Sequence, residues 1–261
     1  MYTSISYDNL ESTADFNKGV SYVLFHIKEG MELFEQSKHK KLFFELAPNY
    51  SYQRSFTTCG IASAVIIMNT IYRKADIQPP ASKGGTFYDK FSNKKYVNLI
   101  WDEENFLDRV KKIIDPQILR GNKLVDGKYN LGIDLVRLSQ CLNLCGVNSN
   151  HKYAHSITSD SINDFRQIIK DITQNSDTYI LVNYSLSIIR DDLESGHFAP
   201  VAAYNQITDK VLLLDPWQPV ISWIWIDLVK LYYGMHTKDG DSFRGYLLIT
   251  HKPTAIIASR L

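Results

Sequence analysis

Cysteine is scarce in this chain of 261 residues, which contains three: Cys59, Cys141 and Cys145. Three thiols cannot pair into a disulfide framework without leaving one over, and the number is low for a secreted domain held together by disulfides. The scarcity therefore indicates a reducing compartment. A chain of this length buries enough apolar surface to fold without covalent cross-links, as one large domain or as two lobes.

Long apolar runs are also missing. No uninterrupted hydrophobic segment approaches the roughly 20 residues that cross a bilayer. Residues 1–18 are polar and acidic, without the basic start and apolar core of a secretory signal. We expect a soluble, cytoplasmic protein with no membrane partner, and export by a route that reads no such signal stays open.

An excess of either charge is absent too, because 29 basic against 28 acidic residues leave a formal net charge of +1. The basic residues are scattered, apart from segment 38–41, which precedes an apolar stretch and fits a solvated helix end. Nucleic-acid binding needs a concentrated basic surface. We therefore expect no nucleic-acid partner.

The predicted elements run from helices to strands. Apolar residues at helical spacing indicate helices over 30–37, 61–72, 102–114, 134–145 and 160–172. Short β-branched or aromatic runs indicate strands over 179–185, 197–205, 210–214 and 245–250. Residues 79–98, rich in Gly, Lys, Asn and Pro, predict a long loop or lid.

Cys59 stands just before the helix predicted over 61–72, which is apolar on nearly every face and therefore buried. A thiol at a helix N-terminus meets the positive end of the helix dipole, which favours the nucleophilic thiolate. A cysteine beside an apolar helix is by itself more often a small buried hydrophobe. The position of Cys59 indicates catalysis only if a histidine is available to pair with the thiol.

A histidine and an aspartate are available in the strand region, at His197 and Asp215. In an antiparallel hairpin the numbers of paired residues have a constant sum, and a turn near 206–207 gives about 412 to 414. His197 would then face a residue close to Asp215. A later turn, at 208–209, would move Asp215 to the other face unless a bulge near Pro200 corrects the register.

These residues match the needs of a cysteine acyl-transfer enzyme: a thiolate, an imidazole, a group that orients it, and donors for the oxyanion. Cys59 would attack a carbonyl, His197 would act as general acid and then base, and Asp215 would fix the histidine tautomer. The side-chain amide of Gln53, six residues before Cys59, would join the Cys59 backbone N–H in the oxyanion hole. Each residue alone also fits a purely structural role.

Metal sites are not indicated. Cys141 and Cys145 are four residues apart, but leucines share their predicted helix face, so core packing explains them better. His151 and His155 have the same spacing without a third ligand. The tryptophans at 217, 223 and 225 fit core and cleft wall.

A helical lobe that holds the nucleophile thus precedes a sheet lobe that holds the base. This order is typical of papain-like enzymes, whose site lies in the cleft between two lobes. We predict an α+β, papain-like fold in which the nucleophile helix packs on a C-terminal antiparallel sheet. The expected division is a 1–29 extension, a 30–252 catalytic domain split near 175–176, and a 253–261 tail.

The chain resembles the phytochelatin synthases, in particular their short prokaryotic members. The most specific match is Gly-His-Phe-Ala-Pro with Ala-Ala-Tyr shortly after it, within residues 195–204. Further matching segments lie in order between about 30 and 250, at 43–44, 50–53, 59–63 with Asn69, 161–166, 182–184, 212–215 and 244–246.

The resemblance implies a papain-like fold and glutathione as substrate. Cys59 would be acylated by the γ-glutamylcysteinyl group as glycine leaves; transfer to water gives γ-glutamylcysteine, and transfer to a second glutathione gives phytochelatin. Arg244 would anchor a substrate carboxylate, with Gly196 and Tyr204 as further substrate-binding residues. Hydrolysis would need no cofactor, and a heavy-metal ion (Cd or Zn) would enter synthesis as a thiolate complex of the substrate.

The chain also departs from the family. The segment after Asp215 differs, which leaves the acceptor side open, and residues 2–29 and 84–98 have no clear counterpart. The sequence ends soon after 250 without the cysteine-rich region of plant enzymes, so we expect hydrolysis to dominate. The alternatives are a papain-like peptidase acting on peptide tails, with loop 79–98 widening its cleft, and a non-catalytic protein that binds thiol peptides or metal thiolates. A homodimer stays open.

Overall fold

A seven-stranded antiparallel sheet forms the centre of the computed structural model, which describes residues 22–119, 124–125, 128–129, 132–174, 177–189, 195–217 and 222–251. Its strands, in spatial order, are β1 (Tyr22–Leu24), β10 (Ile224–Asp227), β9 (Lys210–Leu213), β8 (Gly196–Asn205), β7 (Thr178–Ser185), β13 (Gly245–His251) and β6 (Val147–Tyr153). Each strand pairs antiparallel with its neighbours. Central strands β7 and β8 are buried over nearly their whole length, as expected for a sheet covered on both faces.

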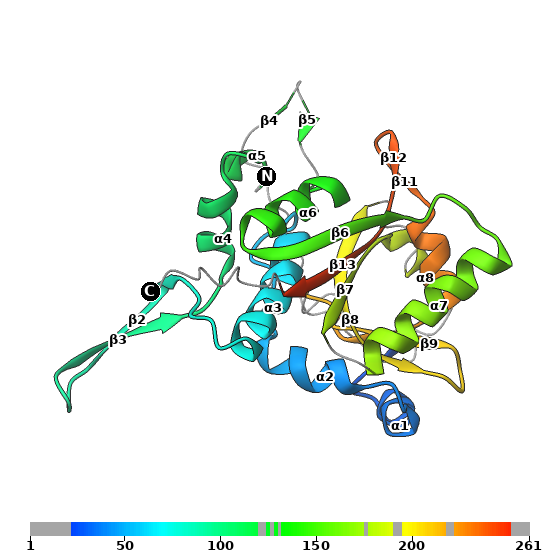
Figure 1. Cartoon of the computed structure of the whole chain (residues 1–261), viewed down its shortest axis with the longest axis horizontal. Coiled ribbons are helices and arrows are strands. Elements are labelled where there is room, and N and C mark those ends of the chain that lie inside the picture. The colour runs from blue at the N-terminus through cyan, green and yellow to red at the C-terminus, as the bar shows by residue number, and fades with distance from the viewer. Residues whose placement is uncertain are drawn as a thin grey trace, which may run out of the picture.

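Helices lie on both sides of this sheet (Figure 1). In that view α3 (Cys59–Lys74), α4 (Glu103–Val110) and α6 (Leu135–Leu144) lie on the left of it, and α7 (Ser159–Gln174) and α8 (Leu228–Met235) on the right. The remaining helices are α1 (Lys28–Gln36), α2 (Lys41–Leu46) and α5 (Pro116–Leu119), with single 3₁₀ turns at Ala47–Asn49 and Leu186–Ile188. The mixed helix and antiparallel-sheet class that the sequence predicts is therefore confirmed.

Helix α3 is the buried helix that the sequence predicts. Its residues from Cys59 through Ile71 are all buried, and the helix ends at two basic residues that favour the negative end of its dipole. At the other end, Thr58 is the N-cap, but its side chain caps no helical N–H. The first backbone N–H groups of α3 therefore carry no side-chain cap beside the Cys59 thiol.

The β8–β9 hairpin shows how the register is set. Tyr204 pairs with Val211 and Val201 with Leu213, and the register shifts between Val201 and Ala203. The paired numbers sum to 415 next to the turn and to 414 beyond this bulge, where the carbonyl of Pro200 accepts from the Leu214 N–H at 3.0 Å. The bulge lies next to Pro200, where the sequence suggested one.

Residues 79–98 are not the loop or lid that the sequence predicts. They form a hairpin of β2 (Ala81–Asp89) and β3 (Lys94–Leu99), which extends away from the sheet (Figure 1). β-Branched and aromatic residues favour its strands, and the Asp89 carboxylate accepts from the N–H groups of Phe91 and Ser92 in the turn. Asn93 closes the turn with φ 54°, a left-handed conformation that asparagine tolerates.

The sheet reaches beyond the expected lobe boundaries. β1 lies inside the expected 1–29 extension and β6 inside the expected helical lobe, and both form sheet edges. Edge strands need few hydrophobic residues, and β6 is largely polar with several exposed side chains. Its sequence therefore does not predict a strand. Small hairpins also pair β4 (Leu124–Val125) with β5 (Lys128–Tyr129), and β11 (Lys238–Asp239) with β12 (Ser242–Phe243). Among the described residues, no helix has both the length and the apolar content to cross a bilayer.

Candidate active site

Three elements bring Cys59, His197 and Asp215 together. Cys59 opens α3, His197 is the second residue of β8, and Asp215 follows β9 two residues after the strand ends. The His197 Nε2 atom lies 2.9 Å from each carboxylate oxygen of Asp215. The imidazole is also hydrogen-bonded to Cys59. All three residues are buried.

The charges of this cluster favour a protonated imidazole. Burial by itself lowers the pKa of His197, but the negative charges of Asp215 and Cys59, together with hydrogen bonds to both, outweigh burial and raise that pKa to about 10. His197 is therefore an imidazolium at neutral pH. A cation in this place stabilises a cysteine thiolate and can donate a proton to a leaving amine.

The Asp215 carboxylate is held by donors besides His197. The Tyr184 hydroxyl donates to it at 3.2 Å and the Trp217 backbone N–H at 2.8 Å, while the Tyr50 hydroxyl donates to the Asp215 carbonyl at 2.6 Å. Burial, and then the charges of Asp215 and Cys59, raise the pKa of Tyr184 well above its ordinary value, so its hydroxyl remains a donor. Tyr184 and Tyr50 are not among the site residues that the sequence predicts. Tyr184 faces His197 across the β7–β8 pair, and a pairing of these strands would have indicated it.

Aromatic side chains form one wall beside the imidazole. The Trp217 ring lies 5.9 Å from the His197 ring, centre to centre, and Phe56 meets Trp217 edge to face at 5.3 Å. Trp225, in contrast, is fully buried in the core. The expected division of the tryptophans between core and cleft wall fits these positions.

Gln53 lies in the loop before Cys59, but its amide is engaged within that loop. Its Nε2 donates to the carbonyls of Ser55 at 3.0 Å and Phe56 at 3.4 Å, and its Oε1 is buried without a partner. The Gln53 backbone N–H donates to the Pro216 carbonyl at 3.0 Å, which ties this loop to the segment after Asp215. In this conformation the side-chain amide does not present a free donor, and the oxyanion-hole role of Gln53 stays a prediction.

Arg244 packs against Gly196, the residue before His197. A Cβ atom added at Gly196 would lie 2.9 Å from both Nε and Nη2 of Arg244, so the Arg244 side chain in this position leaves no room for one. Nη1 donates to the Thr237 hydroxyl at 2.9 Å and to the Lys238 carbonyl, whereas the buried Nε has no partner. Burial lowers the pKa of Arg244, against the opposing charge of Asp239.

Tyr204 does not lie at this site. It is seven residues from His197 along β8, a separation of about 23 Å in an extended strand. Its hydroxyl donates to Asp209 at 2.7 Å, and Asp209 also accepts two hydrogen bonds of 2.8 Å from Arg166. The structure therefore places Tyr204 away from Cys59 and His197, where its hydroxyl holds the β8–β9 turn against α7.

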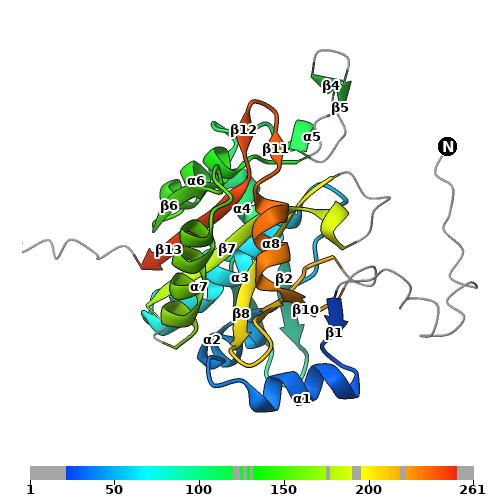
Figure 2. The ribbon, with the colours of Figure 1, turned by 90° about the vertical axis from the view of Figure 1, so that its right-hand side faces the viewer.

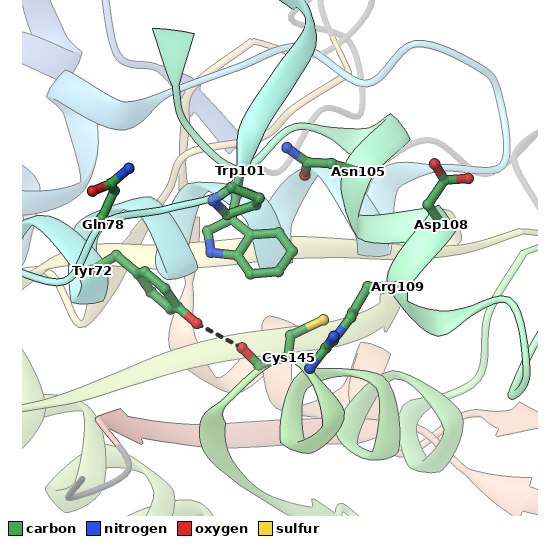
Figure 3. Close-up of a pocket in the computed structure, with 8 residues that line it drawn as sticks. Tyr72, Gln78, Trp101, Asn105, Asp108, Arg109 and Cys145 are labelled. Atoms are coloured by element: carbon green, nitrogen blue, oxygen red, sulfur yellow. Dashed lines mark hydrogen bonds between the residues drawn. The ribbon is translucent and has the colours of Figure 1, made fainter. Parts of the chain in front are cut away.

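The other two thiols lie in the interior. Burial raises the pKa of Cys141 and of Cys145 to about 12 in each case, with smaller contributions from the charges of Asp134 and Cys141 respectively. Cys145 reaches a cavity of about 450 Å³ beside Tyr72 and Trp101 (Figure 3). This cavity lies near the far end of α3, about 20 Å along the helix from Cys59. It is separate from the Cys59 site.

Comparison with known proteins identifies the family of this chain. The family model described as phytochelatin synthase matches residues 19–246. The chain belongs to the phytochelatin synthase family. Within this family it is 24% identical over 231 residues to glutathione gamma-glutamylcysteinyltransferase 3 of Lotus japonicus, covering 87% of this chain and 42% of that protein.

Two further relatives are also named glutathione gamma-glutamylcysteinyltransferases. Glutathione gamma-glutamylcysteinyltransferase 1 of Arabidopsis thaliana is 24% identical over 87% of this chain and 41% of its own, and the transferase of Schizosaccharomyces pombe is 20% identical over 82% and 45%. The chain thus spans less than half the length of these relatives. Among solved structures, xylellain, a cysteine protease from Xylella fastidiosa, aligns at 9% identity and a TM-score of 0.42, over 90% of this chain and 96% of that one.

Proposed function

We propose that this protein is a thiol acyltransferase that cleaves glutathione through a Cys59 acyl-enzyme. The observation that carries the proposal is the buried contact series from Cys59 through His197 to Asp215, in a member of the phytochelatin synthase family. The named activity of the relatives, glutathione gamma-glutamylcysteinyl transfer, supplies the substrate class.

Each residue has one role in the proposed reaction. The Cys59 thiolate attacks the carbonyl carbon between the cysteine and glycine residues of glutathione, while backbone N–H groups at the start of α3 stabilise the oxyanion. His197 gives its proton to the glycine nitrogen, the C–N bond breaks and glycine leaves. The neutral imidazole then takes a proton from water or from the amine of a second glutathione as either attacks the thioester.

Arg244 is the proposed carboxylate anchor. Its guanidinium adjoins Gly196, next to the general acid, and its Nε–H has no partner among the described residues. A partly desolvated guanidinium gains most from a charged acceptor such as a substrate carboxylate. Gly196 contributes by leaving room for this side chain.

Water and a second glutathione compete as acceptors in this scheme, with hydrolysis as the main outcome. Hydrolysis uses no cofactor, and cadmium or zinc takes part in synthesis as the thiolate complex of the second substrate. The cytoplasm is the proposed location, since Cys59, Cys141 and Cys145 are free thiols.

The peptidase alternative has lost its main support. It rested on residues 79–98 forming a loop that widens the cleft, whereas these residues form the β2–β3 hairpin, which extends away from the sheet and contacts α4 (Figure 1). A small thiol peptide remains the better substrate.

The test is incubation of the purified protein with glutathione, with and without cadmium, following glycine release and product mass. We expect glycine and γ-glutamylcysteine from the wild type, and a covalent γ-glutamylcysteinyl adduct on the peptide that contains Cys59. Cys59→Ala should release no glycine. Absence of glycine release by folded wild type would refute the reaction, and undiminished release by Cys59→Ala would refute the site.

A further inference from the structure

The β2–β3 hairpin is an exposed projection that the proposed reaction does not use. It stands clear of the sheet (Figure 1), and all six residues of β3 are exposed. In the view turned by 90°, β2 lies behind α3 and α8, farther from the viewer (Figure 2). An isolated two-stranded hairpin gains little stability from its own contacts, so exposed apolar residues on it are not explained by folding.

Large apolar side chains are concentrated on this hairpin. Of the 13 exposed large hydrophobic residues in the described part of the chain, six lie between residues 81 and 100. Phe91 in the turn is fully exposed, and Tyr88 and Tyr96 follow on the two strands at 56% and 43%. Scattered single apolar residues are normal on a protein surface, whereas this grouping marks a contact surface.

Positive charge accompanies these aromatic rings. Lys90, Lys94 and Lys95 are exposed, and none of the three has an ion-pair partner among the described residues. The one acidic residue of the turn, Asp89, accepts hydrogen bonds from the turn's own N–H groups. The tip therefore combines an exposed aromatic residue with three unpaired cations, in a protein whose net charge is only +1.

Several partners fit this tip poorly. Strand addition along β3 is opposed by its lysines and along β2 by the irregular pairing between Ala81 and Thr86. A second copy of the chain would bring like charges together. A folded protein partner needs roughly 800 Å² from each side, whereas the tip of a two-stranded hairpin is narrow and convex.

We propose that the tip of this hairpin, residues 88–96, binds the surface of an anionic lipid bilayer. Phe91 enters the interface between headgroups and acyl chains, the tyrosines lie at headgroup level, and the three lysines contact the anionic headgroups. This differs from the expectation, from sequence alone, of no membrane partner. It requires no membrane-spanning helix and does not depend on the proposed reaction.

The test is co-sedimentation of the full chain with vesicles of phosphatidylcholine, with and without phosphatidylserine. We expect binding to the phosphatidylserine vesicles that weakens as salt rises. Replacing Lys90, Lys94 and Lys95 together by Gln should weaken binding at least about tenfold. Phe91→Ser should weaken it while leaving the salt dependence. These side chains are exposed, so both variants should keep the wild-type thermal midpoint.

Matched controls distinguish binding at the hairpin tip from non-specific electrostatic or hydrophobic binding to the vesicles. One control replaces three exposed lysines elsewhere, Lys38, Lys111 and Lys112, by Gln, and another is Ile207→Ser at a turn residue that is 68% exposed. Both should bind like the wild type. No binding to anionic vesicles, or equal loss in test and control variants, would overturn the proposal. A dimer in light scattering that Phe91→Ser converts to monomer, without vesicle binding, would assign the tip to contact between copies instead.

Discussion

At the scale of single residues, the site depends on how Asp215 acts on His197. The carboxylate contacts Nε2 with both oxygens and is itself held by Tyr184 and by the Trp217 N–H. The carboxylate is therefore held in the position where its negative charge offsets the cost of burying an imidazolium. Asp215 both orients the ring and sets the pH range in which the ring is protonated.

The activity should consequently persist far into the alkaline range. Because the pKa of His197 is raised to about 10, the imidazolium that would protonate the leaving glycine in the proposed reaction is present below that pH and lost as pH rises through it. The same sign holds for stability. The His197–Asp215 pair contributes fully to the free energy of unfolding below the pKa of histidine in the unfolded chain, near 6.5, and this contribution is lost as pH rises through about 10.

Asp215→Asn tests this dependence in a pH profile of kcat/KM for glycine release. Without the carboxylate charge, burial dominates and lowers the pKa of His197, so the alkaline limb should move to lower pH. Activity at neutral pH should fall at least about tenfold. An alkaline limb that stays in place would show that Asp215 does not set the protonation of His197.

Tyr184→Phe should have a smaller effect. It removes one donor at 3.2 Å from Asp215 and leaves the other two. We expect a loss of about 1 kcal/mol in the free energy of unfolding, measured with urea, and a less than tenfold fall in kcat/KM. A loss of activity as large as that of Asp215→Asn would instead place the tyrosine hydroxyl in the reaction itself.

At the scale of elements, the site depends on β13 lying close between its neighbours. A Cβ atom at Gly245, the first residue of this strand, would lie 2.0 Å from the Lys152 carbonyl oxygen of β6. No side chain can rotate to relieve a collision with backbone. Glycine here allows β6 and β7 to flank β13 and places Arg244 beside β8.

Gly245→Ala should therefore destabilise the protein by about 1–3 kcal/mol or more, measured as a shift of the urea midpoint. Gly84→Ala is the matched control, because its added Cβ would meet no atom within 4 Å. The control should stay within about 0.5 kcal/mol of the wild type. Equal midpoints for the two variants would contradict the close packing at Gly245.

The same elements show what the sequence could and could not predict. Cys59 and His197 have local signals, a helix start and a hairpin, so their segments could be placed in advance. The position of Asp215 opposite His197 depends on the bulge near Pro200, and a proline suggests such a bulge without determining its place. Tyr184 could not be assigned, because its role exists only through the pairing of β7 with β8. The position of Tyr204 could have been predicted, because the strand expected over 197–205 already separates it by seven residues from His197.

At the scale of the whole molecule, the sheet and the β2–β3 hairpin are separable. Ala81 and Leu99 pair at the base of the hairpin, so a short turn can join the chain there. The contacts between the hairpin and the rest of the described protein are concentrated on α4. The Cys59 site belongs to the sheet and α3 and does not require the hairpin.

Replacing residues 84–97 by a short Gly-Ser turn should leave glycine release unchanged and shift the thermal midpoint by no more than about 2 °C. Calorimetry and the glycine assay on one preparation check both. A large fall in the midpoint would show that the hairpin stabilises α4, and a fall in activity alone would place it in substrate binding.

The interior position of Cys141 and Cys145 has a practical consequence for measuring this protein. Both thiols are buried and stay protonated well above neutral pH, whereas Cys59 faces a charged imidazole. Under native conditions iodoacetamide should therefore add one carbamidomethyl group per folded chain, at Cys59. Intact-mass measurement of that stoichiometry then counts competent molecules in any preparation, before a turnover number is calculated.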